Sequence, residues 1–158
     1  MRVPVRKTSV KQDGFGLIQF ASEDVIIYGG FRVNGPVRPD KTRLAFHAFD
    51  RQALQDLGQE ASKIAYLELT VLQGDPPQIV ELVKIDVPKH KRGQGYGERV
   101  LAAIVGSTPD GGLEVIDIKP SAIGFWNKMG IVPVAGRTRQ LDATIHADFE
   151  LDYSRANP

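Results

Sequence analysis

The chain has 158 residues, of which 42% are hydrophobic and 25% charged, as expected for a single globular domain spanning residues 1–158. The formal net charge of +1 makes nucleic acid an unlikely partner, and the lack of cysteine excludes disulfides, cysteine nucleophiles and thiolate metal sites. No stretch reaches the ~20 apolar residues that span a bilayer and no signal-peptide pattern opens the chain, so we expect a cytoplasmic protein without a membrane partner.

The first half of the chain shows short strand patterns separated by turn residues. The predicted strands are residues 16–20, 24–28 and 43–47. Gly29-Gly30 and residues 34–36 are typical of turns between such strands. Asp50 is a suitable N-cap for a helix that would run to about Ala61, because the apolar residues that follow it have helical spacing.

The second half has a clearer pattern, beginning with a hairpin. Residues 64–73 alternate between apolar and polar side chains, and residues 78–87 form a second strand after a proline-containing turn, which predicts an antiparallel pair. In the second strand Val80, Leu82 and Ile85 do not share one strict face, which indicates a bulge or twist. A helix follows over about residues 95–105. The remaining predicted elements are a strand at 113–118, a helix at 121–129 and strands at 131–134 and 143–151. This order predicts an α/β (α+β) fold on one mixed, mostly antiparallel sheet flanked by helices.

A glycine-rich loop, Arg92-Gly93-Gln94-Gly95-Tyr96-Gly97, joins the hairpin to the next helix. The first amides of a helix have no intrahelical partner and its dipole adds about half a positive charge there, so anions bind at such ends. Glycines have no Cβ to obstruct a phosphate, and Arg92 adds a cation. The loop has neither the Walker nor the dinucleotide-fold glycine pattern, so the residues alone predict a site for a pyrophosphate without naming the molecule that carries it.

The same loop resembles the main signature of the Gcn5-related N-acetyltransferase (GNAT) superfamily, which is Gln/Arg-x-x-Gly-x-Gly/Ala after a bulged strand. A second motif of the family, in its last helix, is similar to residues 122–131. The resemblance covers about residues 66–151 and implies an acyl-CoA-binding core at 64–151. Residues 1–60 form a divergent acceptor-side segment, in which the two helices usual for the family are not evident.

The resemblance implies a binding site for acetyl-CoA and no metal. The backbone of Arg92–Gly97 would bind the pyrophosphate, while the main chains of Ile85 and Val87, on a strand splayed from its neighbour, would contact the pantetheine and thioester. Side chains near the thiol end would be Ser121, Phe125 and Trp126. The three histidines have no metal-ligand spacing, which also argues against a metal site.

Glu81 is the candidate catalytic residue, because it lies eleven positions before Arg92, where the histone-acetyltransferase branch has a general base. Attack on a thioester requires a neutral amine, and a carboxylate that removes its proton accelerates the reaction by about 10²–10⁴-fold. The alternative is a Glu81 that only faces solvent or pairs with a lysine. Trp126 stands where many members have an acidic tyrosine, which leaves Ser121, Tyr96 or water as the proton donor.

The resulting prediction is transfer of acetyl from acetyl-CoA to a primary amine of a small molecule or protein, by direct attack in a ternary complex. It is compatible with a homodimer. One alternative is a non-catalytic acyl-CoA-binding or interaction module, suggested by the missing tyrosine. Another is transfer to a nucleic-acid base or a tRNA-linked amine, suggested only by the basic residues near the N-terminus.

Overall fold

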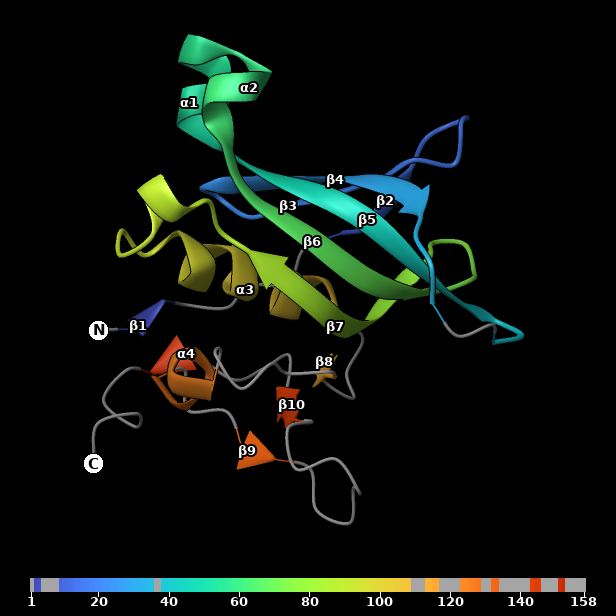
Figure 1. Ribbon diagram of the computed structural model, residues 1–158. Coiled ribbons are helices and arrows are strands. Elements are labelled where there is room, and N and C mark those ends of the chain that lie inside the picture. Colours follow the sequence, from blue (N-terminus) through green and yellow to red (C-terminus); the bar gives the residue numbers. More distant parts are fainter. Residues whose placement is uncertain are drawn as a thin grey trace.

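Figure 1 shows the computed structural model of the chain. The structure describes residues 2–3, 9–35, 38–108, 113–116, 123–128, 132–133, 143–145 and 151–152. Every structural statement below concerns these residues. None of the helices among them is long and apolar enough to cross a membrane.

The fold is built on a nine-stranded sheet in the order β2-β3-β4-β5-β6-β7-β8-β10-β9. Its strands are β2 (Lys11–Gln12), β3 (Ile18–Ala21), β4 (Val25–Arg32), β5 (Lys41–Asp50), β6 (Lys63–Leu72), β7 (Gln78–Asp86), β8 (Leu113–Val115), β9 (Val132–Pro133) and β10 (Ala143–Ile145). All neighbours are antiparallel except β7 and β8, which are parallel. The predicted α+β class with a mixed, mostly antiparallel sheet is confirmed.

The predicted strand at 143–151 is described only at its two ends, and residues 146–150 lie outside the described residues. Its beginning is β10, which pairs with β8 and β9 in the main sheet. Its end overlaps β11 (Leu151–Asp152), which pairs with β1 (Arg2–Val3) in a separate two-stranded ladder. The two ends therefore belong to different ladders, which the local sequence pattern does not reveal.

Gly29 and Gly30 lie inside β4, so the turn predicted at this pair is wrong. Between the pairs Gly29–Phe46 and Phe31–Ala45, one residue of β4 has no partner on β5, which makes Gly30 a β-bulge. A Cβ on Gly29 would lie 2.3 Å from the carbonyl oxygen of Ala45. Glycine is required at position 29 because two backbones approach closely, not because the chain reverses.

Asp50 caps a helix as predicted, since its Oδ1 accepts a hydrogen bond from the amide of Ala53 at 3.0 Å. The helix is shorter than expected. It ends as α1 (Arg51–Leu57), and Gly58, with φ of 81°, separates it from the four-residue α2 (Gln59–Ser62). Figure 1 shows α1 and α2 at the end of the sheet where β5 passes into β6.

The predicted hairpin of β6 and β7 is confirmed to within one residue at each end. Its ladder is irregular. Two residues of β7, Val80 and Val83, have no partner on β6, so β7 carries two bulges. They explain why the apolar residues of this strand do not alternate strictly in the sequence.

Helix α3 (Tyr96–Ser107) lies along one face of the sheet (Figure 1), close to the predicted span of 95–105. Its predicted apolar face is fully buried, and comprises Val100, Leu101, Ile104 and Val105. It packs in one core with large side chains of the strands, among them Phe20, Ile27, Phe46, Leu67, Leu69 and Leu82. The short α4 (Ile123–Lys128) confirms the predicted second helix and adds Trp126 to this core.

Candidate functional site

The glycine loop begins after β7 with the 3-10 turn η1 (Lys89–Lys91) and ends at the first residue of α3. Gly93 and Gly95 both have positive φ, of 78° and 80°. Gly95 is the N-cap of α3, and no side chain caps this helix end. The first bond of the helix runs from the amide of Arg99 to the carbonyl of Gly95 at 3.2 Å. The amides of residues 96–98 therefore precede the intrahelical hydrogen bonds.

The space in front of the loop is open. A Cβ built on Gly93 or on Gly95 would have no heavy atom of another residue within 4 Å. A left-handed backbone beside unfilled space, at an uncapped helix end, is what a phosphate needs to approach main-chain amides. The residues present therefore fit the pyrophosphate predicted for this loop.

The side chain of Arg92 braces the loop against the end of β7. Its Nε donates to the carbonyl of Val87 at 2.8 Å, and its Nη2 lies 3.3 Å from Oδ1 of Asp86. Gln94 makes a second brace, since its Nε2 donates to the carbonyl of His90 at 3.3 Å. The guanidinium of Arg92 is thus held at the strand end, and more than half of the side chain remains exposed to solvent.

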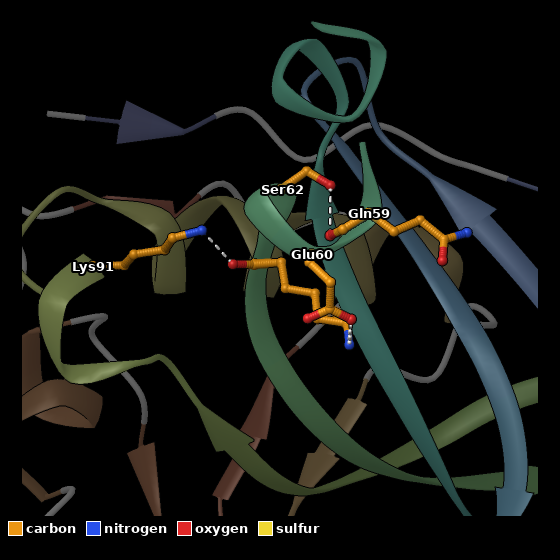
Figure 2. A network of polar contacts seen from close by, with 5 residues as sticks. Gln59, Glu60, Ser62 and Lys91 are labelled. Atoms are coloured by element: carbon orange, nitrogen blue, oxygen red, sulfur yellow. Dashed lines mark hydrogen bonds and ion pairs between the residues drawn. The ribbon is translucent and has the colours of Figure 1, made fainter. Parts of the chain in front are cut away.

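Lys91 ties the loop to α2. Its Nζ donates to the main-chain carbonyls of Ala61 and Lys63, and Figure 2 shows the side chain reaching across to this end of the helix. A cation is favourable there, because the last carbonyls of a helix lack partners. The loop is consequently anchored on both sides, by Arg92 to β7 and by Lys91 to α2.

Three predicted site residues meet at the start of α3. A Cβ on Gly97 would lie 3.3 Å from Cε2 of Phe125 and 3.8 Å from Cγ2 of Val87. Phe125 in turn packs edge-on against Trp126, with ring centroids 4.9 Å apart. Trp126 is 6% exposed and belongs to the core, whereas Phe125 is only partly buried. Phe125 and Val87 therefore form an apolar wall beside the loop, and Trp126 supports it from within.

The other residues predicted to contact the cofactor are not part of this apolar wall. Tyr96 is partly buried, with the guanidinium of Arg99 4.7 Å above its ring. Ile85 is partly buried on β7 and packs against the core. Ser121 lies outside the residues that the structure describes.

Glu81 lies in the first half of β7 and is 7% exposed. Both of its carboxylate oxygens accept hydrogen bonds from Arg38: Nη2 donates to Oε1 at 2.9 Å and Nη1 to Oε2 at 3.2 Å. Burial raises the pKa of the Glu81 carboxyl, but the polar and positively charged groups around it, chiefly Arg38, together leave the pKa below its usual value. Glu81 is therefore ionised at neutral pH and held in a bidentate ion pair.

Glu81 and the glycine loop are at opposite ends of the same strand. Val87 lies six positions after Glu81, which corresponds to at most roughly 20 Å along an extended strand. The parallel partner β8 pairs with β7 at Glu81 and Leu82, and the amide of Ile116 donates to the carbonyl of Leu82 at 3.0 Å. The structure thus brings Val87, the loop and Phe125 together, but not Glu81.

Nothing in the local sequence points to Arg38, because its partner is 43 residues away and on another element. Glu98 was also missed, although a signal existed. It lies three and seven positions before Leu101 and Val105, on the apolar face of α3, and is 4% exposed. Its Oε1 has no hydrogen-bond partner among the described residues. Burial raises the pKa of Glu98 to about 7, against the opposing charge of Arg99.

Comparisons of the chain with models of protein families, with curated proteins and with solved structures found no match. Function is therefore inferred from the geometry of this chain. Among the described residues, no group of three or more histidine, aspartate or glutamate side chains is arranged to hold a metal ion.

Proposed function

We propose that this protein is an acyl-CoA-dependent N-acyltransferase of the GNAT type, which transfers acetyl from acetyl-CoA to a primary amine. The proposal is carried by the loop of residues 92–97, in which two left-handed glycines face open space at an uncapped helix end. The setting of this loop also supports the proposal. It follows a bulged strand, β7, whose next neighbour, β8, is parallel and enters the sheet after α3.

The loop supplies the binding energy for the donor. Main-chain amides at the start of α3 bind the pyrophosphate, and the half-exposed guanidinium of Arg92 adds positive charge beside them. The carbonyl of Val87 already accepts a hydrogen bond from Arg92, so we assign the main-chain contact with the pantetheine to Ile85. Val87 contributes its side chain, which together with Phe125 forms the apolar wall.

Glu81 is the group of this chain that accepts the proton of the attacking amine, directly or through water. When bound, acetyl-CoA supplies the thioester whose acyl group passes to the amine. The lowered pKa keeps Glu81 in the carboxylate form that this role requires. Because Arg38 holds both carboxylate oxygens, the role also requires at least one of these hydrogen bonds to open.

The ion pair with Arg38 favours a second candidate, a non-catalytic acyl-CoA-binding module. A carboxylate with both oxygens engaged serves as a structural link between β7 and the connection from β4 to β5. In such a module the loop would bind coenzyme A as in the enzyme, and Glu81 would only stabilise the fold.

Thiol release from acetyl-CoA in the presence of a panel of primary amines distinguishes the two functions. For the enzyme, we expect turnover with at least one amine, and Glu81→Gln should lower kcat by about 10²-fold or more at unchanged affinity for coenzyme A. Glu60→Gln, which changes an exposed carboxylate, is the matched control and should leave kcat unchanged. Binding of coenzyme A without thiol release for any amine would support the module and contradict the enzyme.

A further inference from the structure

We propose that Glu81 is the centre of a binding site for a guanidinium or primary ammonium group, and that the protein's own Arg38 occupies this site. The site is defined by the bidentate contact of Arg38 with a carboxylate that is almost fully buried. Its identification as the place where a cationic acceptor binds rests on the proposed function. The cation site itself does not.

The carboxylate has the geometry of a receptor for a planar, forked cation. Both oxygens of Glu81 receive a hydrogen bond, at 2.9 and 3.2 Å, from the two terminal nitrogens of one guanidinium. This arrangement recognises guanidinium specifically, whereas an ammonium group binds the same carboxylate as a point charge. The two side chains differ in access: that of Arg38 is 31% exposed and that of Glu81 only 9%. A ligand from solvent therefore meets the occupant first.

The surroundings of Glu81 require a cation. Thr70 lies directly opposite on β6, and Glu114, a second carboxylate, lies opposite on β8. The charge of Glu114 also favours a cation at Arg38. Lys41 acts on Glu81 as well and, like Arg38, stabilises its charged form. If Arg38 left, the buried carboxylate of Glu81 would lose its hydrogen-bonded partner, which is costly unless another cation takes its place.

The occupant is on a connection, whereas its receptor is on the sheet. Arg38 belongs to no strand and lies in the segment 33–40 between β4 and β5. Figure 1 shows the end of β4 and the beginning of β5 at the end of the sheet away from α1 and α2, near the beginning of β7. Arg38 can therefore leave Glu81 without breaking a ladder of the sheet, as connections move at lower cost than strands.

The position along β7 relates this site to the donor. The glycine loop is at the end of the strand, and Glu81 lies at most roughly 20 Å before Val87. A donor held by its pyrophosphate at the loop and extended along β7 points its acyl group toward Glu81. A cationic amine that replaces Arg38 is then bound along the same strand, β7, as the thioester. The acceptor class that follows is a diamine, a guanidine-bearing amine, or a lysine or arginine side chain.

Binding of methylguanidinium chloride, measured by isothermal titration calorimetry, tests the site without any acyl donor. Removing the occupant with Arg38→Ala should tighten binding at least about tenfold over the wild type, a change of ~1.4 kcal/mol. The double variant Arg38→Ala/Glu81→Gln should lose the binding. Arg32→Ala, which removes an exposed arginine of β4, should bind as the wild type does. N-methylurea, a neutral molecule of similar shape, should not bind to any variant.

The proposal is overturned if Arg38→Ala binds methylguanidinium no more tightly than the wild type, or if the double variant binds as well as Arg38→Ala. Should Arg38→Ala not fold, Arg38→Gln replaces it, with the same expectations. The two proposals can fail separately. Tight binding without thiol release would keep the cation site and contradict the acyltransferase. Turnover of neutral and cationic amines with equal KM in the Arg38 variant would contradict the site as the acceptor position.

Discussion

Glycine has opposite uses in the two regions of this molecule. In the antiparallel meander of β3 to β6, Gly29 lies where two backbones nearly touch, and a Cβ would collide with β5 at 2.3 Å. In the loop between β7 and α3, Gly93 and Gly95 have positive φ and nothing within 4 Å of where a Cβ would be. The first glycine is explained by the fold itself. The other two leave a space that no part of the described chain uses.

The strand pairing of the two regions also differs, being more regular in the meander than at β7. From β3 to β6 every strand pairs antiparallel with its neighbour in sequence, and each ladder has at most one register shift. β7 has two bulges on one side and a parallel partner on the other, reached through the loop and α3. We infer that the meander is the scaffold and that the irregular strand, together with the loop that follows it, carries the candidate site.

The largest expected effect is on the stability of the meander. Gly29→Ala should lower the free energy of unfolding by about 3 kcal/mol, because the added methyl must displace the backbone of β5 at Ala45 and Phe46. Gly14→Ala is the control, since a Cβ there meets no atom within 4 Å, and it should change stability by less than about 0.5 kcal/mol. Urea denaturation followed by circular dichroism measures both. Equal stability of the two variants would contradict the close approach at Gly29.

A smaller effect concerns the beginning of α3, beside the candidate site, and is a change in the pH dependence of stability. The pKa of Glu98, the buried carboxyl in the first turn of α3, is raised from 4.5 to about 7 in the folded protein. The native state thus holds this proton more tightly than the unfolded chain does. The contribution is fully present below about pH 4.5 and is lost as the pH rises through about 7. Glu98→Gln should therefore be more stable than the wild type at pH 8, by about 1–2 kcal/mol after allowance for solvent screening, and nearly equal at pH 4.

Glu60→Gln is the matched control for Glu98→Gln, because Glu60 is exposed and pairs only with Lys63 at the helix surface. Its stability should follow that of the wild type at both pH values, within about 0.5 kcal/mol. Thermal unfolding at pH 4 and pH 8 shows whether Glu98→Gln differs from the wild type only at the higher pH. A parallel pH dependence of Glu98→Gln and the wild type would show that Glu98 is not a buried, proton-holding group.

Much of the fold could be predicted because its signals are local. The alternation at β6, the cap at Asp50 and the glycine loop before α3 each lie within about ten residues of sequence. The Gly29-Gly30 pair gave a wrong prediction, because a turn and a close approach of two strands both favour glycine. β10 and β11, at the two ends of the predicted strand 143–151, lie in different ladders, and such pairing depends on the whole fold rather than on the local sequence.

The candidate site likewise contains residues that local sequence predicts and one residue that it does not. The loop at Arg92–Gly97 and its neighbours Val87 and Phe125 come from adjacent motifs, and they meet in the structure. Glu81 was predicted from the family resemblance, which places a general base eleven positions before Arg92. Its partner Arg38 was not, because an ion pair between a connection and a strand 43 residues away leaves no periodic trace in the sequence. Yet this contact decides whether Glu81 is available to an amine.

The affinity for coenzyme A tests the central claim most directly, measured by isothermal titration calorimetry for the wild type, Gly95→Ala and Gly16→Ala. Gly16 has φ of 82°, close to the 80° of Gly95, so both substitutions impose a similar backbone strain, of the order of 1–2 kcal/mol. We predict that Gly95→Ala weakens binding by at least about tenfold and that Gly16→Ala leaves it unchanged. Equal affinity of Gly95→Ala and the wild type, or no binding by the wild type, would contradict the assignment of the loop.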